Sequence, residues 1–99
     1  MKQYVVYFMT NKNNRVVYIG VTSKLVKRVY QHKTKACKGF TSKYNCDKLV
    51  YFEVYSNIND SIIREKQLKK GTGKKKNDLI NIENPEWKDL SEGWVFNVS

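Results

Sequence analysis

Two short segments near the start of the chain are rich in β-branched and aromatic residues, which is the pattern of β-strands. They span residues 4–9 and 15–20, and the asparagine-rich stretch 11–14 that separates them favours a turn. The pattern therefore predicts a β-hairpin. If the turn is a four-residue loop, the register sets Tyr7 opposite Tyr18, so that the two phenol rings share one face of the sheet.

Beyond the hairpin, apolar residues recur at helical spacing in three places and alternate with polar ones in a fourth. The alternation at residues 48–55 predicts a third strand with one buried face. The helical spacing predicts helices over about residues 25–34, 61–70 and 79–82, with a long connection at 36–47. The expected fold is an α/β sandwich in the order ββαβαα, a small sheet flanked by helices.

The length of 99 residues suits one domain. We expect a single domain over residues 1–99, with a core at about 3–90 and a C-terminal tail at 91–99. The longest apolar run, residues 4–9, is far shorter than the roughly 18 residues that a membrane span needs. Because the first residues also lack the features of a secretory signal, we expect a cytoplasmic protein.

The chain is strongly basic, with 19 Lys and Arg against 9 Asp and Glu and a formal net charge of +10. An A/T-rich genome would favour Lys over Arg, but it would not make acidic residues scarce. A positive field of this size attracts polyanions, so we expect a nucleic acid as partner. An acidic protein and a membrane surface are the alternatives.

The two cysteines, Cys37 and Cys46, are expected to be free thiols, because disulfides are rare in the cytoplasm. Together with His32 they would form only an incomplete zinc site of unfamiliar spacing. We therefore expect no zinc.

Two of the predicted helices place ionisable residues beside their apolar faces. Arg28 and His32 are four residues apart and lie on one face of the first helix, although both could be solvated surface residues. Glu65 shares a ridge with Ile62 and Leu68, which puts a carboxylate beside the core face of the second helix. Because an unpaired buried carboxylate is costly, Glu65 is expected to meet a cation of the chain or a metal ion.

Several segments, taken in order, resemble the GIY-YIG endonuclease family, above all its small stand-alone bacterial members, which are related to the amino-terminal nuclease domain of the excision-repair subunit UvrC. The resemblance covers about residues 3–90. The segments that carry it are Val5-Val6-Tyr7, Tyr18-Ile19-Gly20, Arg28 to Lys33, Arg64 to Lys70 and Asn84 to Leu90. Val5 departs from the first Gly of the signature, and Gly71-Thr72-Gly73 stands where relatives often have Trp and basic residues.

The resemblance implies a three-stranded antiparallel sheet flanked by helices and a DNA endonuclease assisted by one divalent cation, Mg²⁺ or Mn²⁺. Arg28 would be the fixed cation, since its planar guanidinium suits phosphate oxygens. Glu65 would hold the metal ion, with water and phosphate oxygens filling the other positions. A single carboxylate argues against a site with two metal ions.

The resemblance also assigns roles to residues outside the metal site. Tyr7 is expected to act as the base, with a phenol pKa lowered by neighbouring cations, and Tyr18 to support it. His32 is an alternative base or proton relay. Gly20 is expected to support the site, and so is Asn84, which could equally be a turn residue before a proline.

Lysines on either side of these residues are expected to follow the phosphates of DNA without reading its sequence. The candidates are Lys24, Lys27, Lys33, Lys35, Lys69, Lys70, Lys74 and Lys75. Because no separate recognition domain is visible, we expect structure-selective cutting in repair or recombination, with DNA as partner and a protein partner as a potential source of targeting. The alternative is a non-catalytic nucleic-acid-binding module. The sequence does not predict the oligomeric state.

Overall fold

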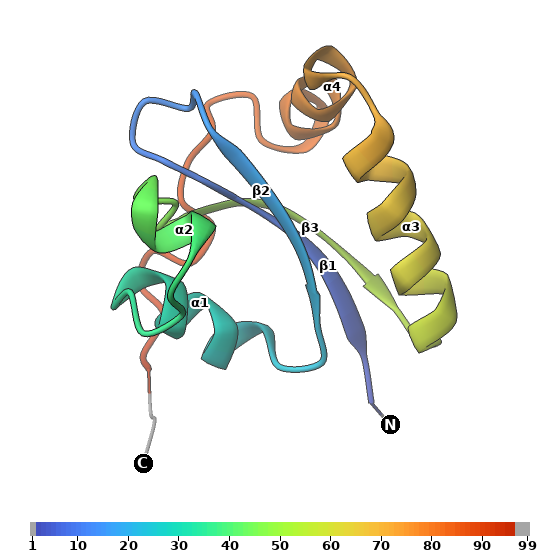
Figure 1. The fold of residues 1–99 in the computed structure, drawn as a ribbon, viewed down its shortest axis with the longest axis horizontal. Coiled ribbons are helices and arrows are strands. Elements are labelled where there is room, and N and C mark those ends of the chain that lie inside the picture. The colour runs from blue at the N-terminus through green and yellow to red at the C-terminus, as the bar shows by residue number, and fades with distance from the viewer. Residues whose placement is uncertain (1, 97–99) are drawn as a thin grey trace.

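A computed structural model describes residues 2–96 and arranges them around a three-stranded sheet (Figure 1). The strands are β1 (Tyr4–Thr10), β2 (Val17–Thr22) and β3 (Lys48–Tyr55), in the spatial order β2-β1-β3. Both pairings are antiparallel, and the central strand β1 is buried from Val5 to Thr10. The expected antiparallel sheet is confirmed.

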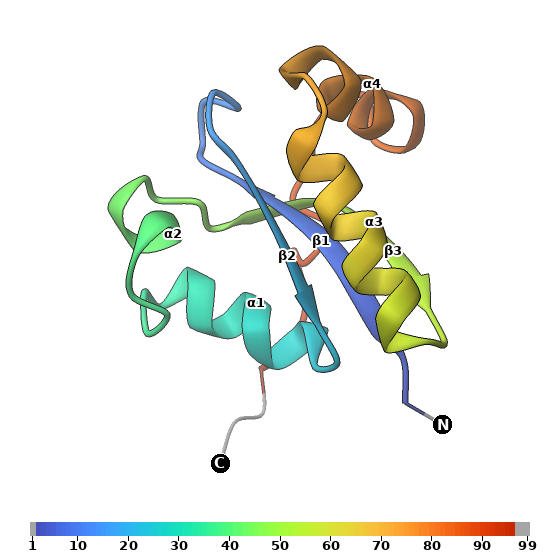
Figure 2. The same cartoon turned by 45° about the vertical axis from the view of Figure 1, so that its right-hand side comes forward.

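Helices cover both faces of the sheet (Figures 1 and 2). Helices α1 (Leu25–Lys33) and α2 (Phe40–Lys43) lie on one side, and α3 (Ile58–Lys70) and α4 (Gly73–Glu83) lie on the other. The order is therefore ββααβαα, one helix more than the expected ββαβαα. The additional helix is α2, which lies in the stretch 36–47, where a single turn is too short to show a helical period.

Alternate residues of β1 enter two hydrophobic cores on opposite faces of the sheet. The core on the α1 side consists of Val5, Tyr7, Met9, Val29, Cys46 and Leu49. The core on the α3 side consists of Val6, Phe8, Ile19, Val50, Tyr51, Leu68 and Ile80. Tyr7 thus points toward α1, where the candidate site lies.

The register of the hairpin differs from the expected one. Tyr7 pairs with Gly20, and Tyr18 pairs with Met9, so the prediction that Tyr7 lies opposite Tyr18 is wrong. The loop is longer than four residues because the Asn11 side chain accepts hydrogen bonds from the backbone N–H groups of both residues 15 and 16. The difference is two residues, which preserves the face of each side chain. The Tyr7 and Tyr18 rings therefore remain neighbours, with centroids 6.2 Å apart.

Burial along β3 does not follow the simple alternation that the sequence predicts. The register shifts between Phe8 and Met9, so that Val50 and Tyr51 both enter the α3-side core. This irregularity has the form of a β-bulge, which places two residues of one strand against one of its partner. Past the bulge, Phe52 is 39% exposed.

A side chain caps the N-terminus of α3. Asn57 accepts hydrogen bonds from the backbone N–H groups of Asn59 and Asp60. The helix therefore begins three residues earlier than predicted.

Of the expected tail, Trp94 and Phe96 pack against the α1-side core, and residues 97–99 lie outside the described part. Within residues 2–96, the longest helices fall well short of the length and apolarity of a membrane span.

Candidate active site

Strand β2 forms the floor of the candidate site, with α1 and α3 on either side of it (Figure 2). The strand contributes Tyr18 and Gly20, and its neighbour β1 contributes Tyr7. Helix α1 contributes Arg28 and His32, whereas Glu65 comes from α3 (Figure 1). Residues far apart in the sequence thus come from elements that lie beside β2 in the fold.

A chain of hydrogen bonds connects Tyr7 to α2 through His32. The hydroxyl of Tyr7 lies 2.9 Å from Nε2 of His32, and Nδ1 of His32 lies 2.9 Å from the hydroxyl of Thr41. His32 is 1% exposed and Thr41 is 4% exposed, so all three polar groups are buried. Both ring nitrogens therefore have partners, which a buried imidazole requires. Thr41 was not predicted, because its helix was not.

Gly20 leaves room for the phenol of Tyr7. A β-carbon at Gly20 would stand 2.6 Å from the Tyr7 hydroxyl oxygen, closer than such atoms can approach. The absence of a side chain is therefore a steric requirement of the Tyr7 position. This gives a physical reason for the last residue of the second signature element.

The electrostatics of the site keep the Tyr7–His32 pair neutral. Burial, with a further contribution from the Arg28 cation, lowers the pKa of His32 to about 4. Burial also raises the pKa of Tyr7 well above its usual value, and nearby Tyr18 acts in the same direction, while Arg28 opposes them. The prediction that neighbouring cations of the chain lower the pKa of Tyr7 is therefore wrong, because burial outweighs the effect of Arg28. At neutral pH, His32 is an uncharged hydrogen-bond acceptor beside a protonated phenol.

Arg28 lines a cleft of about 360 Å³ between α1 and α3, named here the Arg28 cleft. The residues around it are Tyr4, Val21, Thr22, Ser23, Lys24, Lys27, Arg28, Gln31, Ile58 and Ile62. Among residues 2–96, the Arg28 guanidinium has one hydrogen-bond partner, Sγ of Cys37, at the long distance of 4.0 Å. Because sulfur is a weak acceptor, the guanidinium keeps most of its donors for another ligand.

A second cleft of about 290 Å³ lies farther along β2 and is named here the Tyr18 cleft. It is lined by Val17, Tyr18, Ile19, Phe40, Lys69 and Lys76. Glu65 stands between the two clefts on α3, three residues after Ile62 of the first and four before Lys69 of the second. We call the two clefts, together with Glu65, the candidate groove.

The Glu65 carboxylate is 16% exposed and lies 3.5 Å from the ammonium of Lys69. Of the two partners expected for it, the chain supplies the cation. Within residues 2–96, no three His, Cys, Asp or Glu side chains converge as a ready-made metal cage. The donor set nevertheless fits Mg²⁺ or Mn²⁺, because Mg²⁺ is often bound by one carboxylate and completes its shell with water and phosphate oxygens.

A second half-buried carboxylate, Glu53 on β3, is fully engaged by its neighbours. Arg64 donates two hydrogen bonds to it, at 2.8 and 3.0 Å, and Tyr51 and Tyr55 donate one each. Burial alone would raise the pKa of Glu53, but these hydrogen bonds hold it below its usual range. The adjacent residues Arg64 and Glu65 therefore lie on different sides of α3. Arg64 forms a structural ion pair with Glu53, and Glu65 lies at the groove.

Asn84 lies away from the groove, in the turn after α4. Its side-chain amide donates to the backbone carbonyls of Val50 and Lys88, and its oxygen accepts from the N–H of Lys88. Val50 belongs to β3, at the edge of the sheet opposite to β2. The alternative interpretation, a turn residue, accounts for these hydrogen bonds.

The eight candidate lysines are divided among several surfaces. Lys24 and Lys27 line the Arg28 cleft and Lys69 the Tyr18 cleft, while Lys35 and Lys70 are exposed. The other three have local surroundings: Lys33 forms an ion pair with Asp89, Lys74 forms one with Asp78, and Lys75 lines a separate hollow beside Arg64. Lys76, which is not among the eight candidates, also lines the Tyr18 cleft.

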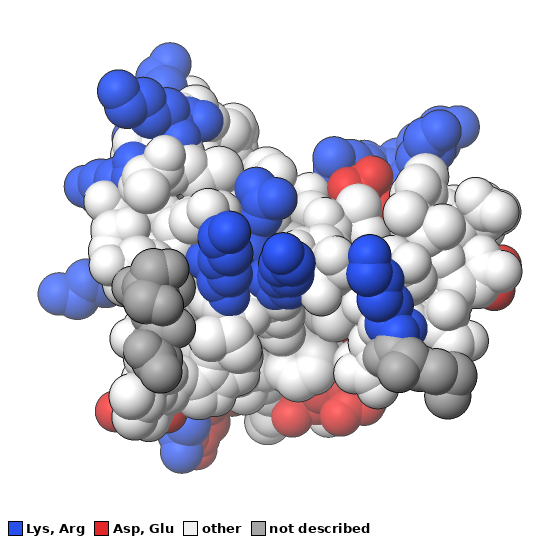
Figure 3. Space-filling model, turned by 90° about the horizontal axis from the view of Figure 1, so that it is seen from below, with Lys and Arg blue, Asp and Glu red and all other residues white. Residues whose placement is uncertain are grey.

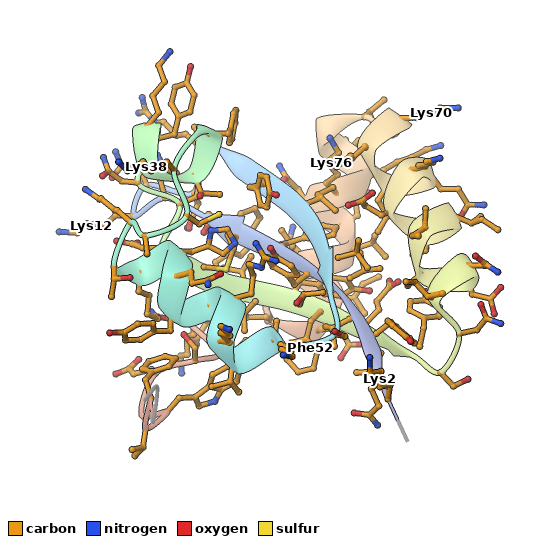
Figure 4. All side chains as sticks on the ribbon, turned by 60° about the horizontal axis from the view of Figure 1, so that its bottom comes forward. Lys2, Lys12, Lys38, Phe52, Lys70 and Lys76 are labelled. Carbon is orange, nitrogen blue, oxygen red and sulfur yellow. The ribbon has the colours of Figure 1, made fainter. Side chains whose placement is uncertain are left out.

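The surface charge is uneven. In Figure 3, most Lys and Arg side chains lie in the middle and upper part of the view, where the outline is hollowed, and acidic side chains lie mainly along the lower edge, with a few at the right and beside the hollow. Figure 4 places Lys38 and Lys76 on opposite sides of β2, so that basic residues flank this strand on both sides. The arrangement suits a negatively charged chain laid along the groove.

Comparison with known proteins gave two matches. A family model described as the GIY-YIG catalytic domain matches residues 3–78. The solution NMR structure of the UPF0213 protein BH0048 from Bacillus halodurans has a similar fold, with a TM-score of 0.57 and 17% sequence identity over 95% of this chain and 99% of that one. A search of curated proteins found no match.

Proposed function

The chain belongs to the GIY-YIG catalytic domain family, a family of nucleases that act on DNA, and from this membership we propose that it is a metal-dependent DNA endonuclease. The observation that carries the proposal is the candidate groove. Its clefts are lined by Arg28 and by Tyr18, and the buried rings of Tyr7 and His32 lie next to Tyr18, with centroids 6.2 and 5.5 Å from its ring. Glu65 lies on α3, which contributes residues to both clefts. Phosphodiester hydrolysis needs a proton acceptor, a fixed cation and a carboxylate for a metal ion.

Tyr7 and His32 would act together as the proton acceptor. We assign the imidazole proton to Nδ1, which donates to Thr41, so that Nε2 accepts from the hydroxyl of Tyr7. As a water molecule attacks phosphorus, its proton passes to the Tyr7 oxygen while the Tyr7 proton passes to Nε2. The raised pKa of the phenol makes a free tyrosinate costly, and this transfer avoids it.

Arg28 would stabilise the charge that gathers on the phosphate oxygens as the bond to water forms. Its guanidinium is half-buried at the wall of the Arg28 cleft, where a low dielectric strengthens its effect. Lys24 and Lys27 in the same cleft would hold flanking phosphates.

Glu65 would hold one Mg²⁺ or Mn²⁺ ion, and the Lys69 ammonium would move away from the carboxylate when the metal ion binds. The bound ion would neutralise charge on the phosphate and on the leaving oxygen. The rest of the groove contributes positive charge without a base-reading element, which supports structure-selective cutting in repair or recombination over sequence-specific cutting.

The test is cleavage of labelled duplex, single-stranded, flapped and four-way-junction DNA by the protein and by its Glu65→Gln variant, with Mg²⁺, Mn²⁺ or EDTA. The parent protein should cut only with a metal ion, and Glu65→Gln should lose at least about 100-fold in rate. DNA affinity in EDTA should be unchanged or higher, because the substitution removes a negative charge from the groove.

Glu83→Gln is the matched control, since Glu83 is an exposed carboxylate on α4. It should cut at the rate of the parent. Equal cutting by Glu65→Gln and the parent would overturn the metal role of Glu65. Binding without cutting on every substrate would instead support a non-catalytic nucleic-acid-binding module.

A further inference from the structure

Two exposed aromatic rings stand beside the candidate groove, one on α2 and one on the residue that follows it. Phe40 is 47% exposed and Tyr44 is 41% exposed, and their ring centroids are 4.7 Å apart. The Phe40 ring also lies 6.1 Å from the ring of Tyr18. A row of three aromatic rings therefore runs from the candidate catalytic residues out to the surface.

The position of this row is fixed by the backbone and by the site itself. Gly39, with a φ of 121°, begins α2 in a conformation that residues with side chains rarely adopt. Thr41, the next residue after Phe40, is buried and hydrogen-bonded to His32. The N–H of Tyr44 donates to the carbonyl of Phe40 at 3.0 Å. The rings are thus held in place before any ligand arrives, which lowers the entropic cost of binding.

The surroundings of the row are basic. Phe40 lines the Tyr18 cleft together with Lys69 and Lys76. The ammonium of Lys43 lies 5.4 Å from the centroid of the Tyr44 ring, and Lys38 stands on the same side of β2 (Figure 4). Flat apolar rings among lysines match the chemistry of a nucleotide, whose base stacks on aromatic groups and whose phosphate attracts cations.

We infer that Phe40 and Tyr44 form a stacking platform for an unpaired nucleobase of the DNA strand that occupies the groove. A base inside a duplex is already stacked on both faces, so these rings can receive only a base that has left the stack. The inference rests on the proposed function, because it takes DNA as the ligand. It adds a substrate feature, an unpaired nucleotide next to the phosphate held in the groove.

The experiment measures binding rather than cutting, with EDTA present, so that its result does not depend on catalysis. Fluorescent single-stranded oligonucleotides and blunt duplexes of equal length are titrated with the protein and with its Phe40→Ala and Tyr44→Ala variants. Each variant should weaken single-strand binding by about 10-fold. Duplex binding, which depends on the lysines, should change less than about twofold.

Phe52→Ala is the matched control, because Phe52 is an aromatic residue of similar exposure, 39%, on β3. It should leave both affinities unchanged. Phe40→Trp and Phe40→Leu separate stacking from apolar burial: Trp should keep the single-strand affinity and Leu should lose it. Circular dichroism confirms that each variant is folded.

An oligonucleotide with 2-aminopurine at successive positions should show quenched fluorescence at one position, and Phe40→Leu should relieve that quenching. The inference is overturned if Phe40→Ala weakens single-strand and duplex binding equally, if Phe40→Leu binds as the parent does, or if the parent binds no single strand. A cleavage failure with intact single-strand selectivity would overturn the proposed nuclease and leave the platform standing.

Discussion

The ring of Tyr7 lies over the backbone of Gly20, its cross-strand partner, with the phenol oxygen 2.6 Å from the point where a β-carbon would stand. The two halves of the signature are thus mechanically coupled. One half supplies the phenol, and the other supplies the space that the phenol occupies while it reaches His32 at 2.9 Å.

Gly20→Ala should therefore displace Tyr7 from His32. Overpacking of a buried site costs about 1–3 kcal/mol, so the free energy of unfolding in urea should fall by that amount. DNA cleavage should fall with it, because the proton-accepting pair is separated. Gly73→Ala is the control: a β-carbon there would meet nothing within 4 Å, and the change should be neutral or stabilise by up to about 1 kcal/mol. Equal stability of both variants would contradict the steric argument.

His32 should make the protein less stable in mild acid. Its pKa is about 4 in the folded chain and 6.5 when unfolded, so the unfolded chain binds more protons between these values. The stability of the fold that depends on an uncharged His32 is complete above about pH 6.5 and is lost as the pH falls toward 4. Between pH 7 and pH 5, the free energy of unfolding should fall by about 2 kcal/mol.

The measurement is urea unfolding at both pH values for the parent and for His32→Gln, which does not titrate. The variant should show a much smaller change over this interval, which lies above the range where carboxylates titrate. A parent and a variant with the same pH dependence would show that another group is responsible.

The Arg64–Glu53 pair should matter for stability and not for the metal binding proposed at Glu65. Arg64→Ala leaves a half-buried carboxylate without its bidentate partner, and we expect a loss of about 2 kcal/mol by urea unfolding. Lys74→Ala removes an ion pair whose lysine side chain is 84% exposed, so it should cost less than about 0.5 kcal/mol. A comparable small loss in both variants would mean that the Glu53 network contributes little.

Lys27 and Lys33, two lysines of one helix, should behave differently toward DNA. Lys27 lines the Arg28 cleft, so Lys27→Gln should weaken DNA binding and reduce the slope of log affinity against log salt by about 1. Lys33 is engaged by Asp89 and by the carbonyl of Asp47, so Lys33→Gln should lower stability by about 1 kcal/mol and leave the salt slope unchanged. Salt titrations of both variants with one duplex check this, and a reduced slope for Lys33→Gln would contradict it.

The sheet and helices α1 and α3 were predictable because their patterns extend over many residues. Helix α4, expected over about residues 79–82, begins six residues earlier, at Gly73, where the side chain of Thr72 caps it. The hairpin register was not, because it depends on hydrogen bonds from the side chain of Asn11 that lengthen the loop. The bulge at Val50 and Tyr51 was not predictable either, because its extra residue interrupts the alternation of buried and exposed residues along the strand.

The candidate site was predictable where helical spacing or the family signature marked it, as for Arg28, His32 and Glu65. Thr41 and Phe40 could not be found, since α2 is one turn long and its neighbours are distant in sequence. That Lys33 pairs with Asp89 and not with the groove could not be predicted from the sequence, because Asp89 is 56 residues away.

The single turn α2 carries Thr41, which faces His32, next to Phe40, which faces outward beside Tyr18. A ligand that settles on Phe40 and a proton that sits on His32 therefore act on the same short segment. Such effects are reciprocal: whatever occupancy of the platform does to the proton affinity of the imidazole, protonation does equally to the affinity of the platform. Through α2, the fold connects the proposed platform to the protonation state of the Tyr7–His32 pair.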